Sequence, residues 1–247
     1  MAEFLTTSGI ASNLEKIVTG AQKRLVLISP YLQFPAILFE RLEQVARKGV
    51  QIVFIYGKEE LKDEQQGKLK QLQNQSLHYY ENLHAKCYLN ENDMIISSMN
   101  LVEYSEKNNR EMGILIHRDS DAKLFSDAKC EVDSILYASQ EVGLTPGRSG
   151  ATPLKVQPRN QGSDKTGHCI RCNTSIPPDR DKPYCPSCFS TWVRYANPEY
   201  KEKHCHLCGK PASVSMARPL CHSCYVAHQN DDWAKPIVDT FRKLFGF

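Results

Sequence analysis

Hydrophobic residues recur along residues 1–140 with two periods, one typical of helices and one typical of strands. Apolar residues at helical spacing predict helices over 12–22, 35–48 and 119–139, and the more polar stretch 62–73 is also helical in pattern. Short apolar runs between these segments predict strands over 24–29, 50–56, 77–80, 83–89, 94–98 and 110–117. Strands that alternate with helices predict an α/β fold, with helices on the faces of a sheet.

Four polar residues stand out in the hairpin that the fourth and fifth of these strands would form. His84 and Lys86 are two residues apart and would share one face of a strand, while Ala85 between them would point into the core. The return strand ends at Ser98, and Asn100 follows at the same spacing. An imidazole, an ammonium, a hydroxyl and an amide at strand ends are suited to bind and attack an anionic phosphoryl group.

This pattern, His-x-Lys followed about a dozen residues later by Ser-x-Asn, resembles the HKD motif of the phospholipase D superfamily. Glu111, in the next predicted strand, stands where the family has a further acidic residue. The family's usual Asp in the middle of the motif has only Glu91 or Asp93 as a counterpart, and Ser97 replaces its Gly. The resemblance covers roughly residues 1–140 and implies an α/β fold with a phospholipase D-like mixed sheet flanked by helices.

The resemblance also implies a phosphodiesterase that needs no catalytic metal. His84 would attack phosphorus, Lys86 and Asn100 would bind the non-bridging oxygens, Ser98 would add a hydrogen bond, and Glu111 would hold a histidine in one tautomer. The nucleophile and the acid for the leaving group stand on opposite sides of an in-line displacement. Family members use two facing copies of the motif and this chain has one, so we expect a homodimer with one His84 from each chain.

The C-terminal part contains an internal repeat of 36 residues. Each copy has two CxxC pairs separated by twelve residues, and four thiolates are the tetrahedral set that Zn²⁺ takes in closed structural sites. We therefore expect two structural zinc ions in modules that resemble zinc-ribbon or treble-clef units, although crossed pairing between the copies stays possible. The expected ligands are Cys169, Cys172, Cys185 and Cys188 in the first module and Cys205, Cys208, Cys221 and Cys224 in the second. The adjacent histidines, His168, His204, His206 and His222, are interpreted as neighbours of the ligands.

Composition divides the chain into four parts. We expect a catalytic domain over 1–140, a flexible linker rich in Gly, Pro and Ser over 141–167, the zinc modules over 168–230 and an amphipathic helix over 231–247. Trp192 and Tyr195 in the first module could stack on nucleic-acid bases or could form the small core that a zinc module needs.

Charge and composition narrow the choice of partners only a little. Residues 1–140 carry 16 Lys and Arg against 19 Asp and Glu, and residues 141–247 carry 15 against 9. Two Zn(Cys)₄ centres at −2 each would reduce the C-terminal excess of +6 to +2, so net charge is a weak argument for nucleic acid. No run of eighteen apolar residues and no leader pattern occur, and we expect a cytoplasmic protein without a membrane partner.

Three functions are compatible with these features. The first is a nuclease that acts on DNA or RNA, with the zinc modules aiding nucleic-acid binding. The second is a phospholipase or phosphatidyl transferase. The third is a catalytically degenerate zinc protein that binds nucleic acid or protein.

Overall fold

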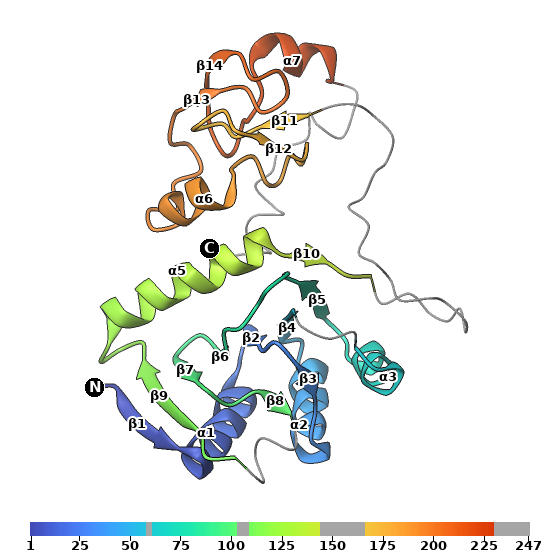
Figure 1. Ribbon diagram of the computed structural model, residues 1–247, viewed down its shortest axis with the longest axis vertical. Coiled ribbons are helices and arrows are strands. Elements are labelled where there is room, and N and C mark those ends of the chain that lie inside the picture. Colours follow the sequence, from blue (N-terminus) through green and yellow to red (C-terminus); the bar gives the residue numbers. More distant parts are fainter. Residues whose placement is uncertain (58–60, 103–108, 144–165, 230–247) are drawn as a thin grey trace. The chain divides into compact units, whose positions relative to one another are not determined.

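The chain divides into two compact units, Met1–Pro153 and Leu154–Phe247, and each is described by itself. The computed structural model describes residues 1–57, 61–102, 109–143 and 166–229 (Figure 1). Most of the predicted linker and the predicted C-terminal helix over 231–247 lie outside these residues. Glu141, where the predicted linker begins, is still paired with a strand of the first unit.

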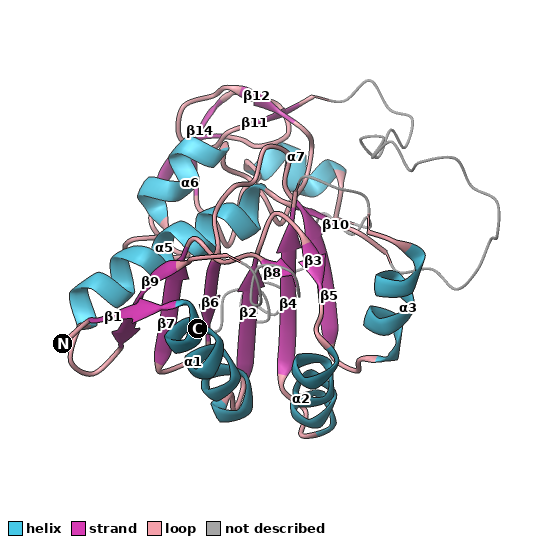
Figure 2. Cartoon of the chain, turned by 60° about the horizontal axis from the view of Figure 1, so that its bottom comes forward, coloured by secondary structure: helices cyan, strands magenta, loops and turns pink. Residues whose placement is uncertain are grey.

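The first unit is built on an eight-stranded mixed sheet in the order β1-β9-β7-β6-β2-β4-β5-β10 (Figure 2). β2, β4 and β5 run parallel, and the other neighbouring pairs run antiparallel. The prediction of an α/β fold with a mixed sheet is thus confirmed. The strands are β1 (Glu3–Thr6), β2 (Arg24–Ile28), β4 (Gln51–Tyr56), β5 (Gln75–Tyr79), β6 (Cys87–Leu89), β7 (Asp93–Ser97), β9 (Met112–His117) and β10 (Gln140–Glu141). A separate parallel pair consists of β3 (Leu32–Gln33) and β8 (Leu101–Val102).

Helices cover both faces of this sheet because the central strands are apolar on both sides. In β2, Leu25 and Leu27 join the hydrophobic cluster under α1 (Thr7–Gly20), α2 (Ala36–Arg47) and α3 (Asp63–Gln71). The alternate residues Val26 and Ile28 join a second cluster under α5 (Ala122–Ala138). The continuous apolar run of the sequence therefore becomes a buried central strand.

The N-terminal region differs from the prediction. β1 was not expected, and α1 begins at Thr7 rather than at residue 12. β1 is an edge strand in which only Leu5 is buried, so its sequence carries little alternation. The first turn of α1 contains few apolar residues, because the helix begins at the sheet edge and reaches the core only at Ile10.

The first strand of the hairpin is shorter than predicted. β6 begins at Cys87, and residues 84–86 precede it without strand pairing of their own in the ladder. Ala85 is exposed and Lys86 is buried, so the expectation that Ala85 points into the core is wrong. The cause is a turn in which the N–H of Leu83 donates to the carbonyl of Tyr80, so that the strand alternation starts only after residue 86.

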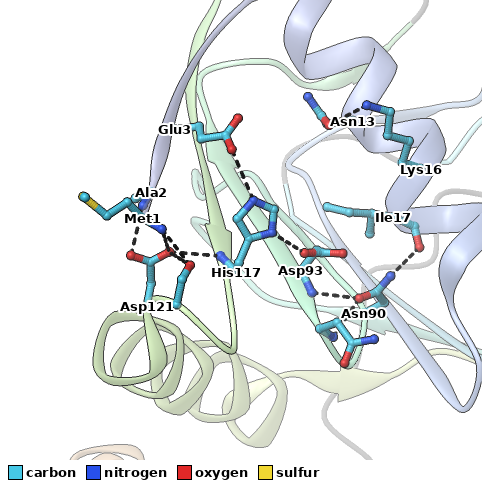
Figure 3. Close-up of polar contacts among 12 residues, drawn as sticks. Met1, Ala2, Glu3, Asn13, Lys16, Ile17, Asn90, Asp93, His117 and Asp121 are labelled. Carbon is cyan, nitrogen blue, oxygen red and sulfur yellow. Dashed lines mark hydrogen bonds and ion pairs between the residues drawn. The ribbon is translucent and has the colours of Figure 1, made fainter.

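The start of α5 also differs from the prediction. The helix begins at Ala122, after Asp121, and not at Asp119. The Asp121 carboxylate accepts hydrogen bonds from the N–H of Ala2 at 2.9 Å and the N–H of His117 at 3.4 Å (Figure 3). Asp121 therefore joins the chain start to the end of β9 rather than capping the helix.

The second unit repeats one small motif twice. The first copy contains β11 (Gly167–His168), β12 (Ser175–Ile176) and α6 (Pro186–Trp192), and the second contains β13 (Glu202–His204), β14 (Pro211–Val214) and α7 (His222–Ala227). Asn173 and Gly209, which are 36 residues apart, both have positive φ, and each N–H donates at 2.9 Å to the carbonyl of the first Cys of its module. The repeat seen in the sequence is therefore also a repeat of backbone geometry.

The two copies pack against each other. The carbonyl of Ile170 accepts hydrogen bonds from the N–H groups of Lys203 and His204, at 3.0 and 2.9 Å. Arg171 of the first copy forms an ion pair with the buried Glu202 of the second, which also accepts a hydrogen bond from Tyr184 at 3.1 Å. The two copies thus share buried polar contacts and form one folded body.

Candidate functional site

The candidate catalytic residues lie at the adjoining ends of three neighbouring strands. Lys86 precedes β6, Ser98 follows β7 and Glu111 precedes β9, and these strands are adjacent in the order β9-β7-β6. Because the strands are antiparallel, the start of one lies beside the end of the next. Backbone bonds extend this pairing beyond the strands, with the N–H of Ser97 donating to Lys86 at 3.2 Å and that of Ser98 to Met112 at 2.9 Å.

His84 and Lys86 contact each other just before the start of β6. The Lys86 ammonium donates to the carbonyl of His84 at 2.8 Å, and its Nζ lies 3.3 Å from the His84 Nδ1. An ammonium has only donors, so Nδ1 accepts in this contact. The Lys86 side chain is buried while His84 is exposed, so the cation lies beneath a ring that solvent can reach. The predicted pairing of the two side chains therefore forms through a turn rather than along a strand.

Ser98 and Glu111 form a second pair beside the first. The Ser98 hydroxyl donates to the Glu111 carboxylate and accepts from the N–H of Met112 at 3.1 Å. The backbone of Glu111 is held in turn by Thr7, because the N–H of Glu111 donates to the Thr7 hydroxyl at 2.8 Å. The start of α1 thereby orients the acidic residue, a contact that the sequence pattern does not indicate.

Asn100 lies in the turn that follows Ser98 and is half-buried. Its side-chain oxygen is buried and has no hydrogen-bond partner among the described residues. Buried polar groups are rarely left unpaired, and the O and N of an amide can exchange by a flip. Asn100 can therefore present a polar group to a molecule bound at this edge.

Buried hydrogen bonds fix the turn that carries Ser98 and Asn100. The Tyr88 hydroxyl donates to the carbonyl of Met99 at 2.5 Å, and the N–H of Met99 donates to the Ser97 hydroxyl at 3.1 Å. The N–H of Leu101 donates to the Ser29 hydroxyl at 3.0 Å. Burial raises the pKa of the Tyr88 phenol, so it stays protonated and able to donate.

A glycine sets the path of the chain into His84. A Cβ on Gly57 would lie 2.3 Å from the carbonyl oxygen of Tyr80 and 2.4 Å from the Cβ of Leu83. Gly57 follows β4 and lets the turn before His84 pack directly against the end of that strand. Sequence reasoning missed this residue, because the close approach depends on a segment more than twenty residues away.

Glu91 has a structural role in the hairpin. Its carboxylate accepts hydrogen bonds from the N–H groups of Gln22 at 3.2 Å, Lys23 at 2.6 Å and Arg24. Burial favours the protonated acid, but these backbone hydrogen bonds outweigh it and lower the pKa of Glu91. Of the two candidates for the mid-motif acidic residue, Glu91 thus anchors the hairpin turn to the start of β2, and Asp93 instead contacts His117 at 2.6 Å.

The eight repeated cysteines form two separate groups. In each module the four sulfurs lie within 4.8 Å of one another, and the groups are the uncrossed sets, Cys169, Cys172, Cys185 and Cys188, and Cys205, Cys208, Cys221 and Cys224. Tetrahedral Zn–S bonds of about 2.3 Å place sulfurs about 3.8 Å apart. The distances of 3.7 Å between Cys172 and Cys185 and of 3.9 Å between Cys208 and Cys221 fit that geometry. Each group could hold one zinc ion.

One of the adjacent histidines connects the two modules. His206 is fully buried, and its Nε2 accepts from the N–H of Asp179 at 3.2 Å, so Nδ1 carries the proton and donates to the carbonyl of His168 at 2.7 Å. Burial lowers the pKa of His206, which keeps the ring neutral. Its ring nitrogens are both used in joining the modules, which agrees with its interpretation as a neighbour of the ligands.

The two aromatic residues of the first module have different environments. Trp192 is buried, packs on Tyr184 and Phe189, and donates its indole N–H to the carbonyl of Asn197 at 3.1 Å. For Trp192 the core interpretation is correct. Tyr195 is 83% exposed and is open to a binding partner.

Comparison with known proteins finds a family model and solved structures that are similar to the first unit. Residues 14–135 match the family model described as the PLD-like domain of cardiolipin synthase. NucT from Helicobacter pylori is similar with a TM-score of 0.50 and 14% identity, over 57% of this chain and 99% of that chain. Nuc from Salmonella typhimurium, a phospholipase D family member, gives a TM-score of 0.49 and 12% identity over the same shares. A comparison with curated proteins finds no match. At these identities the likeness to NucT shows the fold.

Across the described residues, no helix is both long enough and apolar enough to pass through a bilayer.

Proposed function

We propose that residues 14–135, which match the family model of a PLD-like domain, form a phospholipase D-type domain, and that the chain is a phosphodiesterase that cleaves nucleic acid without a catalytic metal. The observation that carries the proposal is the gathering of His84, Lys86, Ser98 and Glu111 at the adjoining ends of three strands, with Asn100 in the turn beside them. This arrangement combines a nucleophile with donors for a phosphoryl group.

In the first step, a ring nitrogen of His84 attacks phosphorus and the bond from phosphorus to the leaving oxygen breaks. The leaving alkoxide takes a proton from a second imidazole on the opposite side of the phosphorus. Lys86 and Asn100 bind the non-bridging oxygens as their charge increases, and the Ser98 hydroxyl adds a hydrogen bond when its proton turns from Glu111 to the phosphoryl group. The product of this step is a phosphohistidine at His84 and a free hydroxyl on the released fragment.

In the second step, water gives its proton to the second imidazole and attacks the phosphohistidine. The P–N bond breaks, the phosphate monoester leaves and His84 is restored. A single His84 cannot serve on both sides of the phosphorus, so we assign the second imidazole to His84 of another copy in a homodimer. Glu111 orients the site through its contact with Ser98.

Nucleic acid is the substrate class that the second unit favours. Tyr195 and Tyr200 are exposed, and the exposed Lys201 and Lys203 follow Tyr200 within three residues. Bases stack on exposed aromatic rings while cations hold the phosphates. With zinc bound by the two cysteine groups, this unit would present that surface on a rigid support.

The test is to trap the intermediate. The full chain is mixed with labelled single-stranded DNA, RNA or phospholipid vesicles in magnesium-free buffer with chelator, and quenched under alkaline denaturing conditions that preserve phosphohistidine. We expect a covalent adduct with nucleic acid, mapped by mass spectrometry to His84 and missing in His84→Ala. The zinc content of the same sample is measured so that loss of structural zinc is detected, and His117→Ala is the matched control outside the site.

Other outcomes would assign one of the competing functions. An adduct with phospholipid alone would make the chain a phosphatidyl transferase or phospholipase, a reading that the cardiolipin-synthase description of the family model favours. No adduct and no turnover with any substrate, in protein that still binds nucleic acid, would make it a degenerate binding protein.

A further inference from the structure

The helices of the two cysteine modules begin in the same way but bury their side chains differently. In α6 the N–H of Phe189 donates to the carbonyl of Cys185 at 2.9 Å. In α7 the N–H of Tyr225 donates to the carbonyl of Cys221, also at 2.9 Å. Phe189 is buried, whereas Tyr225, its counterpart 36 residues later, is 47% exposed. The same local backbone therefore places one aromatic ring in a core and the other at the surface.

The side chains of α7 form no core of their own among the described residues. In the first module the buried Trp192 packs on Phe189 and covers it. The position 36 residues after Trp192 is His228, so the second module has a polar residue there. In the part of the chain that the structure describes, α7 has no buried residue, and Val226, next to Tyr225, is 45% exposed. α7 thus presents an aromatic ring and an aliphatic side chain to a partner.

The surface of the second module carries charges of one sign. The only acidic residue over 201–229 is Glu202, which is buried and forms an ion pair with Arg171. The exposed charged side chains over this range are Lys201, Lys203, Lys210 and Arg218. A Zn(Cys)₄ centre at −2 would offset only half of these four charges. The first module, by contrast, exposes acidic side chains at Asp179 and Glu199.

A cationic surface with an exposed aromatic ring is complementary to single-stranded nucleic acid. Unpaired bases can stack on a ring, whereas the bases of a duplex are already stacked on one another. The phosphates between the bases are anions that Lys and Arg side chains bind. Stacking and charge together therefore favour a single strand over a duplex, which would use the charges alone.

We propose that the second cysteine module binds single-stranded nucleic acid, with a base stacked on Tyr225 of α7 and phosphates held by the four exposed cations of the module. This inference rests on the proposed function, because it names the form of nucleic acid that the chain holds and the module that holds it. The exposure of Tyr225 has a reason in this arrangement, since the ring that the first module buries in a core here serves as a stacking surface.

The first test measures binding by fluorescence anisotropy. The full zinc-loaded chain carries His84→Ala, so that the labelled single-stranded oligonucleotide is not cleaved. Tyr225→Ala should weaken binding about tenfold, and Tyr225→Phe should leave it unchanged, because a phenyl ring stacks and a methyl group does not. The same sequence as a duplex, and vesicles of anionic phospholipid, should show no dependence on the residue at position 225.

The second test measures how binding depends on salt. Lys210→Ala and Arg218→Ala should each weaken binding and reduce the slope of log affinity against log salt concentration by about 0.7, the value for one phosphate contact on a single strand. Lys70→Ala is the matched control, because Lys70 is exposed on α3 of the first unit, and it should leave the slope unchanged. Zinc content and circular dichroism should be the same in all variants.

Unchanged single-strand affinity in Tyr225→Ala, or vesicle binding that depends on Tyr225 in its place, would overturn the proposal. So would a Tyr225→Ala variant that melts at a lower temperature but binds as before, since α7 would then pack against protein. Cleavage of nucleic acid by the chain with His84 intact, unaffected by all of these variants, would refute this inference and leave the proposed function standing. Single-strand binding through Tyr225 in a chain that cleaves nothing would refute the proposed function alone.

Discussion

The hydroxyl of Ser98 donates a hydrogen bond to the carboxylate of Glu111, and this contact joins the end of β7 to the start of β9. The two residues are thirteen positions apart, and Glu111 is held in turn by Thr7. Ser98 is therefore positioned by an acidic residue that the sheet brings beside it.

Removing either member of this pair should have the same effect. We expect Ser98→Ala and Glu111→Gln each to lower kcat about 100-fold or more, because each removes the hydrogen bond that positions Ser98 beside the phosphoryl site. The double variant should be no slower than the slower single variant, since the two act as one unit. Steady-state kinetics with Ser120→Ala as the control checks this, and fully multiplicative effects would contradict it.

Gly57→Ala should destabilise the first unit. The added methyl would clash with the Tyr80 carbonyl and with Leu83, and overpacking of this kind costs about 1–3 kcal/mol. The control is Gly67→Ala within α3, where a Cβ meets nothing within 4 Å and helix propensity predicts a gain of about 1 kcal/mol. Urea unfolding should show shifts of opposite sign, and equal shifts would contradict the role of Gly57.

The stability of the first unit should depend on pH through His117. Its Nδ1 lies 2.6 Å from Asp93 and its Nε2 3.6 Å from Glu3, while Lys16 lines the same cavity of about 250 Å³ (Figure 3). The hydrogen bond to Asp93 raises the pKa of His117 against a smaller effect of burial, and the charges of both carboxylates add to it.

A raised pKa means that the native state holds the proton more tightly than the unfolded chain. The stabilisation is therefore complete below the unfolded value of about 6.5 and is lost as the pH rises through the folded value. Melting temperatures from about pH 5 to about pH 9 should show wild type more stable than His117→Asn at low pH, with the difference shrinking as pH rises. An NMR titration that places the His117 pKa below the usual histidine value would contradict this.

Each zinc ion should depend on its own four cysteines. Native mass spectrometry should find two zinc ions in the wild type and one in Cys205→Ser, while Cys130→Ser, on α5, keeps both. Because His206 and the Arg171–Glu202 pair connect the modules, Cys205→Ser should also lower the melting temperature of the first module. Two zinc ions in Cys205→Ser would contradict the assignment.

Local patterns in the sequence were sufficient for part of the fold. The apolar runs over 24–29 and 50–56 predicted β2 and β4, because a strand buried on both faces needs no polar residue. The repeated CxxC spacing predicted two groups of four cysteines, and the sulfurs do gather in those groups. The segment around His84 and Lys86 was predicted as a strand, because polar and apolar residues alternate there as they do in a strand. The structure instead places both residues after a turn and before β6.

The sequence by itself determined the α/β class, the order of most elements and the two groups of four cysteines, because these depend on periodicity and spacing within short segments. Only the tertiary structure decided that a turn on Gly57 presents His84, that Thr7 holds Glu111, that His206 joins the cysteine modules and that Phe4, Ile114 and Ile96 form one exposed row across β1, β9 and β7. Each of these relationships joins residues from separate segments, and their contacts depend on how strands are ordered and registered, which no local pattern specifies.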